Sequence, residues 1–406
     1  MLAATVRVTR DLDLAEDCVQ DAYAQALVHW SANGIPRRPG AWLTTVARRR
    51  AFEQLRRAAT LARKLPLLIV DDAPELPAAW DEDMVYPDDR LRLIFTCCHP
   101  ALSREAQLAL TLRLVCGLSS AEVARAFLVK EATMQARITR AKHKIAGAGI
   151  PYRVPAAREL PERVGVVLDV IHLLYTSGYT AASGEELMRA DLTARALDLA
   201  AMVHQLLPED PEVKGLLALL QLTDARRAAR VSPEGRLVLM ADQDRSLWDR
   251  TMIERGLRLV REALARPLVG RYALMAAIAA VHAEAPRWEE TDWRQLVGLY
   301  DLLLRRWPTP VVALNRAVAL SFAEGPAEAL AALDELAAEP SLASYPYLAS
   351  TRADLLRRLG RTREALDAYR EALRLTGNVA ERDFLRRRIA VLEVLATAPD
   401  DESQAH

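Results

Sequence analysis

The segment from Ser103 to Ile145 constrains the fold more than any other part of this sequence. Its apolar spacing predicts three helices, and the last two have the pattern of a helix-turn-helix. The third helix, over about residues 131–145, has an apolar face beside a cationic one: Met134, Ile138, Ala141 and Ile145 on the first, and Thr133, Arg137, Arg140 and Lys144 on the second. A recognition helix needs one face for packing and another for base edges and phosphates. We therefore predict binding to duplex DNA; the alternative is a surface helix with a solvated cationic face.

The composition indicates an all-α protein. Apolar residues make up 51% of the 406 residues, aromatic residues only 5%, and no long alternation of β-branched residues occurs. This length allows about two to four domains with ample core. No apolar run reaches the roughly 20 residues of a membrane span, and the N-terminal sequence lacks the pattern of a signal peptide. We expect a cytoplasmic protein that does not enter the membrane.

The formal net charge is zero, but the charges are unevenly distributed. Residues 37–64 contain nine basic residues and one acidic residue, Glu53. Residues 11–21 contain five acidic residues and no basic one, and residues 71–89 contain eight acidic residues and no basic one. Because local patches set the field that a polyanion meets, the zero total does not exclude nucleic acid as a partner.

The four cysteines do not have the spacing of a metal site. Cys97 and Cys98 are adjacent and precede His99, whereas Cys18 and Cys116 lie far away in the sequence. Adjacent ligands rarely close a tetrahedral site, and no second pair stands at zinc-finger spacing. We predict buried, apolar roles for the cysteines, with no metal, no disulfide and no cofactor.

The first half of the chain is predicted to contain two small helical domains on a tether. Residues 1–65 form the first, in which a helix packs through a face spaced by four residues and a second helix starts near Ala41 after a Gly- and Pro-containing loop. Residues 66–90 are acidic and punctuated by proline, which predicts a flexible linker. Residues 91–150 form the helix-turn-helix domain. The packing face of the first domain contains Leu14, Cys18, Ala22, Ala26 and Trp30.

The second half is predicted to be helical throughout. Residues 151–290 form a helical extension, residues 291–396 form repeats similar to tetratricopeptide repeats with a capping helix, and residues 397–406 form a disordered tail. The repeat has a spacing of 36 residues, and each copy is a helix, a Gly-containing turn and a second helix. The alternative is two unrelated hairpins of similar composition. The matching residues are Arg316-Ala317 with Glu328-Ala329-Leu330, and Arg352-Ala353 with Glu364-Ala365-Leu366.

The second half contains no motif for catalysis. No nucleophile stands beside a base in a recognisable pattern, and no Gly-rich phosphate loop or ligand cluster occurs. His172, His204 and His282 stand singly in predicted helices, where packed or surface histidines are the more frequent case. We predict that the protein is not an enzyme.

Taken together, the two domains of the first half resemble a bacterial sigma factor of the extracytoplasmic-function group in the sigma-70 family. The segments that carry this resemblance to region two are DLDLAEDCVQDAYAQALVHW and PGAWLTTVARRRAFEQLRR, and the helix-turn-helix block is similar to region four. The second half resembles a subgroup with a long helical extension, through segments such as PEVKGLLALLQLTDARRAAR and ADQDRSLWDR. Two departures stand out: Arg49 occupies a position where the family often has Asn, and Met1 is expected to be a late start.

The resemblance implies three contact surfaces. An acidic helix face in region two would dock on the largest catalytic subunit of RNA polymerase, and the next helix would grip the downstream promoter box. Region four would read the upstream box as a duplex. The polymerase-binding residues would be Asp13, Glu16, Asp17, Gln20 and Asp21; the DNA-binding residues would be Arg48, Arg49, Arg50, Arg56 and Arg57 in region two, and Thr133, Gln135, Arg137 and Arg140, with Lys130, Lys142 and Lys144 on phosphates, in region four.

Opening of the downstream box would need a place for an unstacked base. The resemblance puts a pocket for it in the loop from Asn33 to Arg38. Trp42 and Phe52 have rings that can stack on bases, although Trp42 is expected to pack in the core instead.

These observations predict a transcription initiation factor whose partners are core RNA polymerase, promoter DNA and a regulatory protein at the C-terminal domain. The main alternative is a helix-turn-helix regulator that senses a ligand or a protein and does not join polymerase. A repeat scaffold that binds only proteins is a third class. Neither alternative needs an acidic helix followed by the AWL…LRR helix, so this order favours the first prediction.

Overall fold

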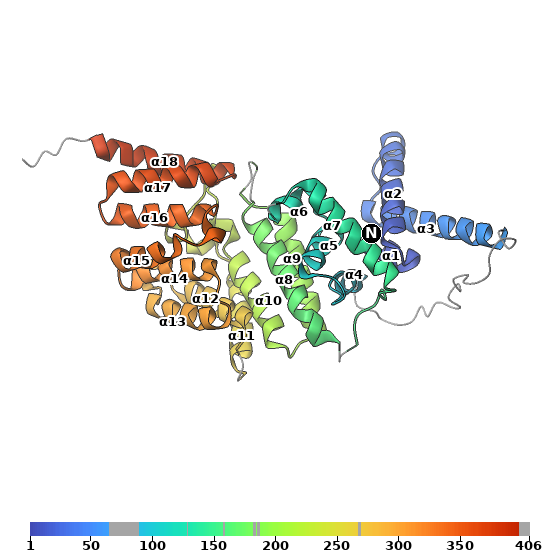
Figure 1. Cartoon of the computed structure of the whole chain (residues 1–406), viewed down its shortest axis with the longest axis horizontal. Coiled ribbons are helices and arrows are strands. Elements are labelled where there is room, and N and C mark those ends of the chain that lie inside the picture. Colours follow the sequence, from blue (N-terminus) through green and yellow to red (C-terminus); the bar gives the residue numbers. More distant parts are fainter. Residues whose placement is uncertain are drawn as a thin grey trace, which may run out of the picture. The chain divides into compact units, whose positions relative to one another are not determined.

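The computed structural model describes residues 1–64, 89–127, 129–156, 159–181, 184, 187–266 and 269–397. Over these residues the chain consists of α-helices and short 3₁₀ turns, with isolated bridges but no β-strand, which confirms the all-α prediction (Figure 1). It divides into two compact units, Met1–Ile171 and His172–His406. Most of the predicted linker, residues 66–90, and of the predicted tail, residues 397–406, lies outside the described residues. No helix in the described part is long and apolar enough to cross a membrane.

The front part of unit 1 is built on close packing between two long helices. Asp11 caps the second helix, because its Oδ1 accepts a hydrogen bond from the backbone N–H of Leu14 at 2.9 Å. Ala22 and Ala26 are buried against Leu43 and Ala47, and these small side chains let the helices approach closely. The predicted packing face is thereby confirmed. The front helices are α1 (Leu2–Thr9), α2 (Leu12–Asn33) and α3 (Pro39–Lys64).

The rear part of unit 1 contains the helix-turn-helix. A capping box starts its first helix: the Ser119 hydroxyl accepts from the N–H of Glu122 at 3.2 Å, and the Glu122 carboxylate accepts from the N–H of Ser119 at 2.7 Å. In the second helix the predicted apolar stripe from Met134 to Ile145 is buried, which confirms how this helix packs. The rear helices are α4 (Asp89–Cys97), α5 (Arg104–Leu114), α6 (Ser120–Ala126) and α7 (Glu131–Gly147).

All four cysteines are free and buried, as their predicted apolar roles require. Burial raises the pKa of the Cys98 thiol to about 12, so this side chain stays protonated and unreactive at neutral pH.

Helix α8 (Leu160–Tyr179) runs through the division between the two units. Within unit 1 its first half carries Asp169, which pairs with Arg104 at the start of α5. Residues 160–171 therefore belong to the same compact unit as the helix-turn-helix, although a stretch of irregular chain separates them from its last helix, α7.

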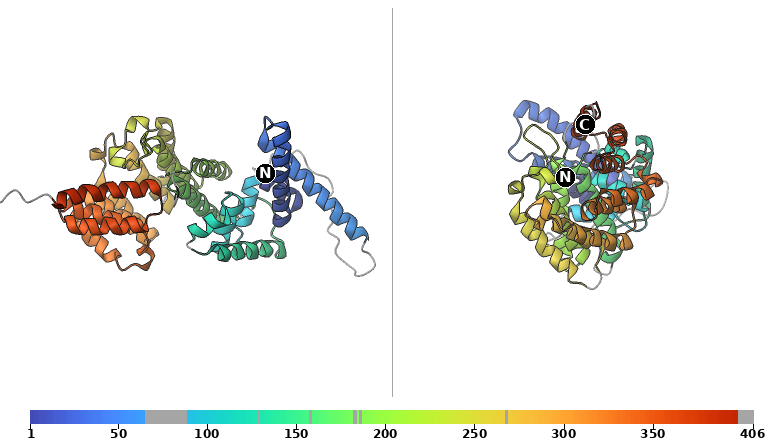
Figure 2. Two further views of the ribbon diagram at one scale, coloured as in Figure 1. Left: turned by 90° about the horizontal axis from the view of Figure 1, so that it is seen from above. Right: turned by 90° about the vertical axis from the view of Figure 1, so that its left-hand side faces the viewer.

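Unit 2 continues with helices that pack on their neighbours along the chain. The last six stack as successive hairpins, which can be followed in Figures 1 and 2. These helices are α9 (Ala190–Leu206), α10 (Pro211–Asp224), α11 (Arg250–Leu264), α12 (Arg271–Glu284), α13 (Trp293–Arg306), α14 (Pro310–Ala323), α15 (Pro326–Leu336), α16 (Pro346–Arg358), α17 (Thr362–Leu375) and α18 (Val379–Thr397).

The predicted internal repeat corresponds to two helical hairpins, α14–α15 and α16–α17. Ala317 and Ala353 are both fully buried, as are Ala329 and Ala365. Each hairpin turns at a glycine with positive φ, at Gly325 (φ 125°) and its counterpart 35 positions later (φ 73°). Matching positions of the two copies therefore have the same role in packing.

Gly215 provides a test of the packing in unit 2, because α10 lies directly on the backbone of α12 there. A Cβ atom at Gly215 would lie 2.5 Å from the backbone nitrogen of Ala273. Alanine has the better helix propensity by roughly 1 kcal/mol, but the clash would force the helices apart. We expect Gly215→Ala to lower the free energy of unfolding by roughly 1–2 kcal/mol net and to lower the melting temperature.

Gly298 in α13 is the matched control. A Cβ atom there meets no other atom within 4 Å. Gly298→Ala should therefore raise the free energy of unfolding by up to roughly 1 kcal/mol. Equal shifts of the melting temperature for the two variants in differential scanning fluorimetry would disprove the close contact between α10 and α12.

Candidate nucleic-acid interface

The predicted DNA-contacting residues of α7 lie on two different flanks of the helix. At roughly 100° per residue, Arg137, Arg140 and Lys144 share a flank with Thr133 beside the buried stripe. Lys142 lies on the opposite flank, as does Gln135. The structure therefore brings together the cationic stripe seen in the sequence, but it separates Lys142 from that stripe.

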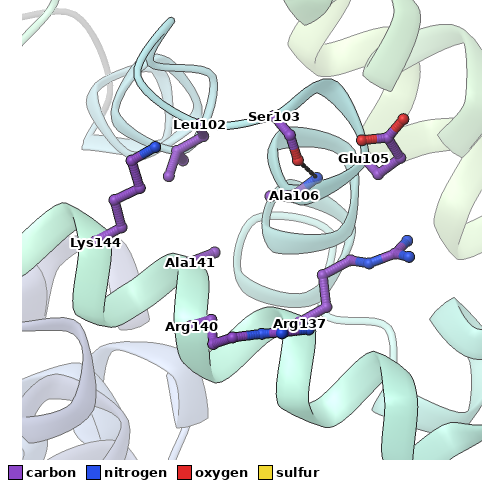
Figure 3. A pocket seen from close by; sticks show the side chains of 8 residues that line it. All are labelled: Leu102, Ser103, Glu105, Ala106, Arg137, Arg140, Ala141 and Lys144. Atoms are coloured by element: carbon purple, nitrogen blue, oxygen red, sulfur yellow. Dashed lines mark hydrogen bonds between the residues drawn. The ribbon is translucent and has the colours of Figure 1, made fainter.

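A cavity of about 310 Å³ lies between this cationic flank and the start of α5. Figure 3 shows Lys144 extending toward Leu102, and Arg137 toward Glu105. One of the side chains around the cavity, Ser103, is also the N-cap of α5, because its hydroxyl accepts a hydrogen bond from the N–H of Ala106 at 3.4 Å. The residues that line the cavity are Leu102, Ser103, Glu105, Ala106, Arg137, Arg140, Ala141 and Lys144.

The chemistry of this cavity suits an anion. Three cationic side chains surround it, and the start of a helix favours negative charge. One carboxylate, Glu105, also lines it. A backbone hydrogen bond, followed by the Ser103 hydroxyl and by Arg137 and Arg104, lowers the pKa of Glu105, so this group is ionised at neutral pH. The cations still outnumber it, and a phosphate oxygen is the ligand that fits best.

Arg137 is held in place by a neighbour from the turn of the helix-turn-helix. Its guanidinium carbon lies 5.9 Å from the centroid of the Phe127 ring, and the side chain is half-buried. Arg140, by contrast, is exposed and donates from Nε to the carbonyl of Ala136 at 3.2 Å. Arg137 is therefore held against Phe127, whereas Arg140 lies along the helix surface and stays exposed.

Thr139 and His143 are not among the DNA contacts predicted from the sequence. Both are exposed on the side of α7 opposite the buried stripe, beside Ala136. Their spacing from Met134 and Ile138 could have located them, because the helix face opposite a buried stripe is the one that projects outward.

Lys142 meets the acidic helix α2 instead of solvent. Its ammonium lies 2.8 Å from Asp13 Oδ1 and also pairs with Glu16, which Arg113 approaches at 3.5 Å. The Lys142 side chain is 12% exposed and that of Glu16 is 16% exposed. Burial lowers the pKa of Lys142, but the hydrogen bonds that its ammonium donates to Asp13 and Glu16 outweigh burial and raise it. Lys142 is therefore charged and fully engaged in this structure.

The outward face of α2 is acidic along its first half and apolar along its second. Asp13, Asp17 and Gln20 are exposed, whereas Glu16 is mostly covered. Further along the same face, Leu27 is 78% exposed and Val28 is 73% exposed. The sequence reasoning missed these two, although they fall outside the packing period of the helix. Leu27 and Val28 therefore leave apolar surface of α2 uncovered.

Asp21 and Arg50 tie α2 to α3. Arg50 Nε lies 3.0 Å from Asp21 Oδ2, and Arg50 Nη1 lies 3.1 Å from Glu53 Oε2. The hydrogen bond to Asp21, and then that to Glu53, raises the pKa of Arg50. Both predicted contact residues therefore have a structural partner inside the front part.

The other predicted cations of α3 differ in accessibility. Arg49, Arg56 and Arg57 are exposed, although Arg49 lies 3.5 Å from Glu53. Arg48 is half-buried, and its Nε has no hydrogen-bond partner among the described residues. The exposed three form the surface that can reach a phosphate backbone.

The aromatic residues and the loop of the front part also have defined places. Trp42 packs against Trp30 with ring centroids 5.5 Å apart, which confirms the expected core role. Phe52 is exposed. In the loop from Asn33 to Arg38, most side chains are exposed, including the apolar Ile35, which the sequence reasoning did not single out.

The histidines of unit 2 behave as packed residues. Burial lowers the pKa of His172 and of His282 to about 4, so both are neutral at pH 7. His172 packs on the ring of Tyr272, and His282 packs against Trp288 and Trp293. These contacts agree with the prediction that His172 and His282 are packed histidines.

Comparisons with known proteins match the two parts of unit 1 separately. Residues 2–60 match the family model described as sigma-70 region 2, and residues 92–145 match that described as sigma-70, region 4. Residues 163–264 match a family of unknown function (DUF6596). The two sigma-70 segments coincide with α1–α3 and α4–α7.

One relative matches along nearly the whole chain. An uncharacterized protein of Rhizobium meliloti (strain 1021) is 43% identical over 401 residues, which cover 98% of this chain and 94% of that protein. Among solved structures, a thermophilic TPR protein of Thermus thermophilus is 21% identical, with a TM-score of 0.37 over 56% of this chain and 97% of that chain.

Proposed function

The chain belongs to the sigma-70 family, as an extracytoplasmic-function type of sigma factor with a C-terminal extension, and we propose that it binds core RNA polymerase and directs it to specific promoters. The observation that carries this proposal is the pairing, within one unit, of an outward acidic face on α2 with a cationic flank on α7. A factor that joins polymerase to DNA needs both surfaces, whereas a plain DNA-binding regulator needs only the second.

Docking on polymerase is assigned to the outward face of α2. Asp13, Glu16, Asp17, Gln20 and Asp21 offer carboxylates and an amide to a basic surface, which steers encounter and fixes orientation. The exposed apolar residues that follow on the same face would add the desolvated centre that a stable interface requires.

Recognition of the upstream promoter box is assigned to α7 in the major groove. Thr133, Gln135, Arg137 and Arg140 are the proposed base-edge or backbone contacts, and Lys130, Lys142 and Lys144 the proposed phosphate contacts. The cavity beside Ser103 supports a phosphate contact for Lys144 in particular. A phosphate held there would set the register of α7 along the groove.

Opening of the downstream box is assigned to α3 and the loop that precedes it. Exposed cations of α3 would hold the backbone while an unstacked base enters the loop from Asn33 to Arg38. Unstacking one base costs a few kcal/mol, and binding of the open strand offsets that cost. No catalytic side chain is required, because the polymerase performs the chemistry.

Lys144 provides a test of the phosphate role. We expect Lys144→Ala to weaken binding to all duplex sequences alike and to reduce the slope of log K against log salt by roughly 0.9, the value for one phosphate contact. Fluorescence anisotropy with an upstream-box duplex and a scrambled duplex at several salt concentrations measures both quantities. A loss confined to the promoter sequence would instead indicate base readout by this side chain.

The C-terminal part is proposed to be a regulatory or protein-binding domain. Stacked helical hairpins present grooves to peptides or to neighbouring domains, and each hairpin of the repeat buries matching residues. The proposed domains are region two to residue 65, region four from 91 to 150, the extension from 151 to 290 and the repeats from 291 to 396. Because residues 160–171 belong to unit 1, a truncation that tests this role should end after Tyr179. Unchanged transcription with that truncated chain would rule out a regulatory role for the C-terminal part.

The proposed function is tested by direct binding. Purified full-length protein and core RNA polymerase should form a complex in size-exclusion chromatography, and the complex should bind promoter duplex more tightly than either component does. A chain that binds duplex DNA without associating with polymerase would be the helix-turn-helix regulator of the competing hypothesis.

A further inference from the structure

Residues 241–250 of unit 2 connect the ends of two helices and have no part in the proposed function. Arg245 Nη1 lies 2.9 and 2.5 Å from two main-chain carbonyls at the end of α12, to which it donates. The N–H of Asp249 donates to the carbonyl of Ala225 at the end of α10, at 2.9 Å. Close to these attachments the segment buries the side chain of Trp248, which is 3% exposed.

Two arginine side chains pack against the ring of Trp248. The guanidinium carbon of Arg245 lies 4.4 Å from the ring centroid, and that of Arg226 lies 5.9 Å from it. Arg226 is 9% exposed and Arg245 is half-buried. Neither guanidinium forms an ion pair with a carboxylate in the part of the chain that the structure describes. Burial of a charge without a partner is costly, so a counter-charge is expected here.

Trp248 and Arg245 each carry a buried donor without a hydrogen-bond partner. Trp248 Nε1 and Arg245 Nη2 make no hydrogen bond to any of the described residues, and Nδ1 of His282 makes none either. His282 lies in the field of both cations, because Arg226 and Arg245 add to the effect of burial in lowering its pKa. Buried polar groups are normally hydrogen-bonded, so these donors mark a place where an acceptor is expected.

The positive charge around Trp248 is only partly offset. Burial first, and then Arg226 and Arg250, lower the pKa of Arg245, whereas Glu289 raises it. Arg250 and Glu289 are both exposed and have opposite charges, so they cancel to a first approximation. The ends of α10 and α12 each contribute about half a negative charge, which offsets about one of the two buried guanidinium charges. About one positive charge therefore remains, together with unused donors.

From this geometry we propose that Arg226, Arg245 and Trp248 form a binding site for the carboxylate of a small organic acid. The two unpartnered donors, Arg245 Nη2 and Trp248 Nε1, match the two oxygens of one carboxylate. The remaining charge matches a single negative charge, whereas a phosphate group carries about −1.5 to −2 at neutral pH. The site is in unit 2 and shares no residue with the proposed polymerase and DNA contacts.

Aromatic side chains beside the site offer a surface to the rest of the acid. His282, whose carbonyl accepts from Arg245, packs against Trp293 with ring centroids 5.6 Å apart. Phe322 stacks on Trp293 at 4.3 Å and is 39% exposed. The short turn that carries Arg245 lies at the surface, because the residues on either side of it are exposed. A small acid can therefore approach the guanidinium from solvent while its apolar part contacts the rings.

Nuclear magnetic resonance of the indole groups tests the site directly. The chain contains seven tryptophans, and the indole signal that Trp248→Phe removes is that of Trp248. Titration of isotope-labelled full-length protein with sodium acetate at neutral pH should shift this signal until it saturates. Acetamide, an uncharged molecule of nearly the same shape, should not shift it, nor should sodium chloride at equal ionic strength. No shift with acetate, or a shift that chloride or inorganic phosphate reproduces, would overturn the proposal.

Arg226→Met separates a binding role from a purely structural one. Replacement of buried charges by apolar side chains of similar volume is often neutral or stabilising. We therefore expect the variant to unfold at the native melting temperature or above it. The acetate concentration at half saturation should rise about 10-fold, as loss of one charge-assisted contact predicts. A structural role alone predicts a lower melting temperature and an unchanged response to acetate.

Arg294→Met is the matched control, because it removes the same charge from an exposed position of α13. Its melting temperature and its response to acetate should equal those of the native chain. An Arg226→Met variant that is folded by circular dichroism and keeps the native half-saturation concentration would contradict the proposal. If Arg226→Met does not fold, the acetate titration of the native chain still decides whether the site exists.

Discussion

Replacement of Asp17 and Gln20 by lysine should lower the affinity for core RNA polymerase by about 100-fold, the largest effect that we expect from any surface change. Both side chains are exposed on the outward face of α2. Like charges that meet across an interface cost several kcal/mol, and roughly 2.7 kcal/mol corresponds to 100-fold. The ion pairs of Lys142 involve Asp13 and Glu16, so this double variant leaves the internal contact in place. Titration of labelled protein with core polymerase measures the dissociation constant.

The control for this prediction makes the same charge change in unit 2. Asp367→Lys with Gln295→Lys alters two exposed side chains in the C-terminal hairpins. We expect its affinity for polymerase to remain within about twofold of the native value, since exposed charges far from an interface contribute little. If both double variants bound polymerase equally well, the outward face of α2 would not be the docking surface.

Removal of the two arginines that line the cavity beside α7 should have the second largest effect. Arg137→Ala combined with Arg140→Ala should weaken binding of upstream-box duplex by about 100-fold, because each good contact to DNA contributes roughly 1–3 kcal/mol. If Arg137 contacts a base, Arg137→Ala alone should also relax the preference at one position of the promoter. Anisotropy titrations with a set of single-base variants separate the two effects.

Arg305→Ala with Arg306→Ala provides the control for this second prediction. These two arginines are exposed at the end of α13, and their loss removes the same charge. Their removal should not change duplex binding at moderate salt. Since Arg137 packs over Phe127, the melting temperature of the cavity variant must also be compared with that of the native chain. A folded cavity variant with native affinity would remove both arginines from the interface.

The local features of the fold followed from periodicity. The stripe from Met134 to Ile145 is buried because apolar residues at helical spacing must face the core, whatever the rest of the chain does. The repeat around Gly325 and Gly360 could also be predicted from the sequence, because a turn with positive φ favours glycine and the flanking helices need an apolar face. Such patterns depend only on residues within one or two turns of each other.

The long-range contacts of the candidate interface could not be predicted from the sequence. Lys142 belongs to a cationic helix, and nothing within that helix indicates that its partner is Glu16. Arg50 and Asp21 likewise look like two separate surface residues, although they bind each other at 3.0 Å. A charge pattern predicts that a side chain is polar, but the choice between solvent, DNA and another helix depends on tertiary packing.

The boundary between the two compact units also depends on tertiary packing that the sequence does not reveal. The sequence places a boundary near the Gly- and Pro-rich exit of the helix-turn-helix domain, and the structure has irregular chain there. Nevertheless, the first half of α8 packs with unit 1, and the units divide within the helix at Ile171. Helical periodicity continues without interruption through that point, because one helix can contribute to two cores.

Run-off transcription from a library of promoter fragments tests the central claim most directly. Core polymerase alone and core polymerase with the full-length protein are compared on the same templates. We predict transcripts that depend on the protein, start at defined positions and share an upstream sequence element. Equal transcription with and without the protein on every template would contradict the assignment of this chain as an initiation factor.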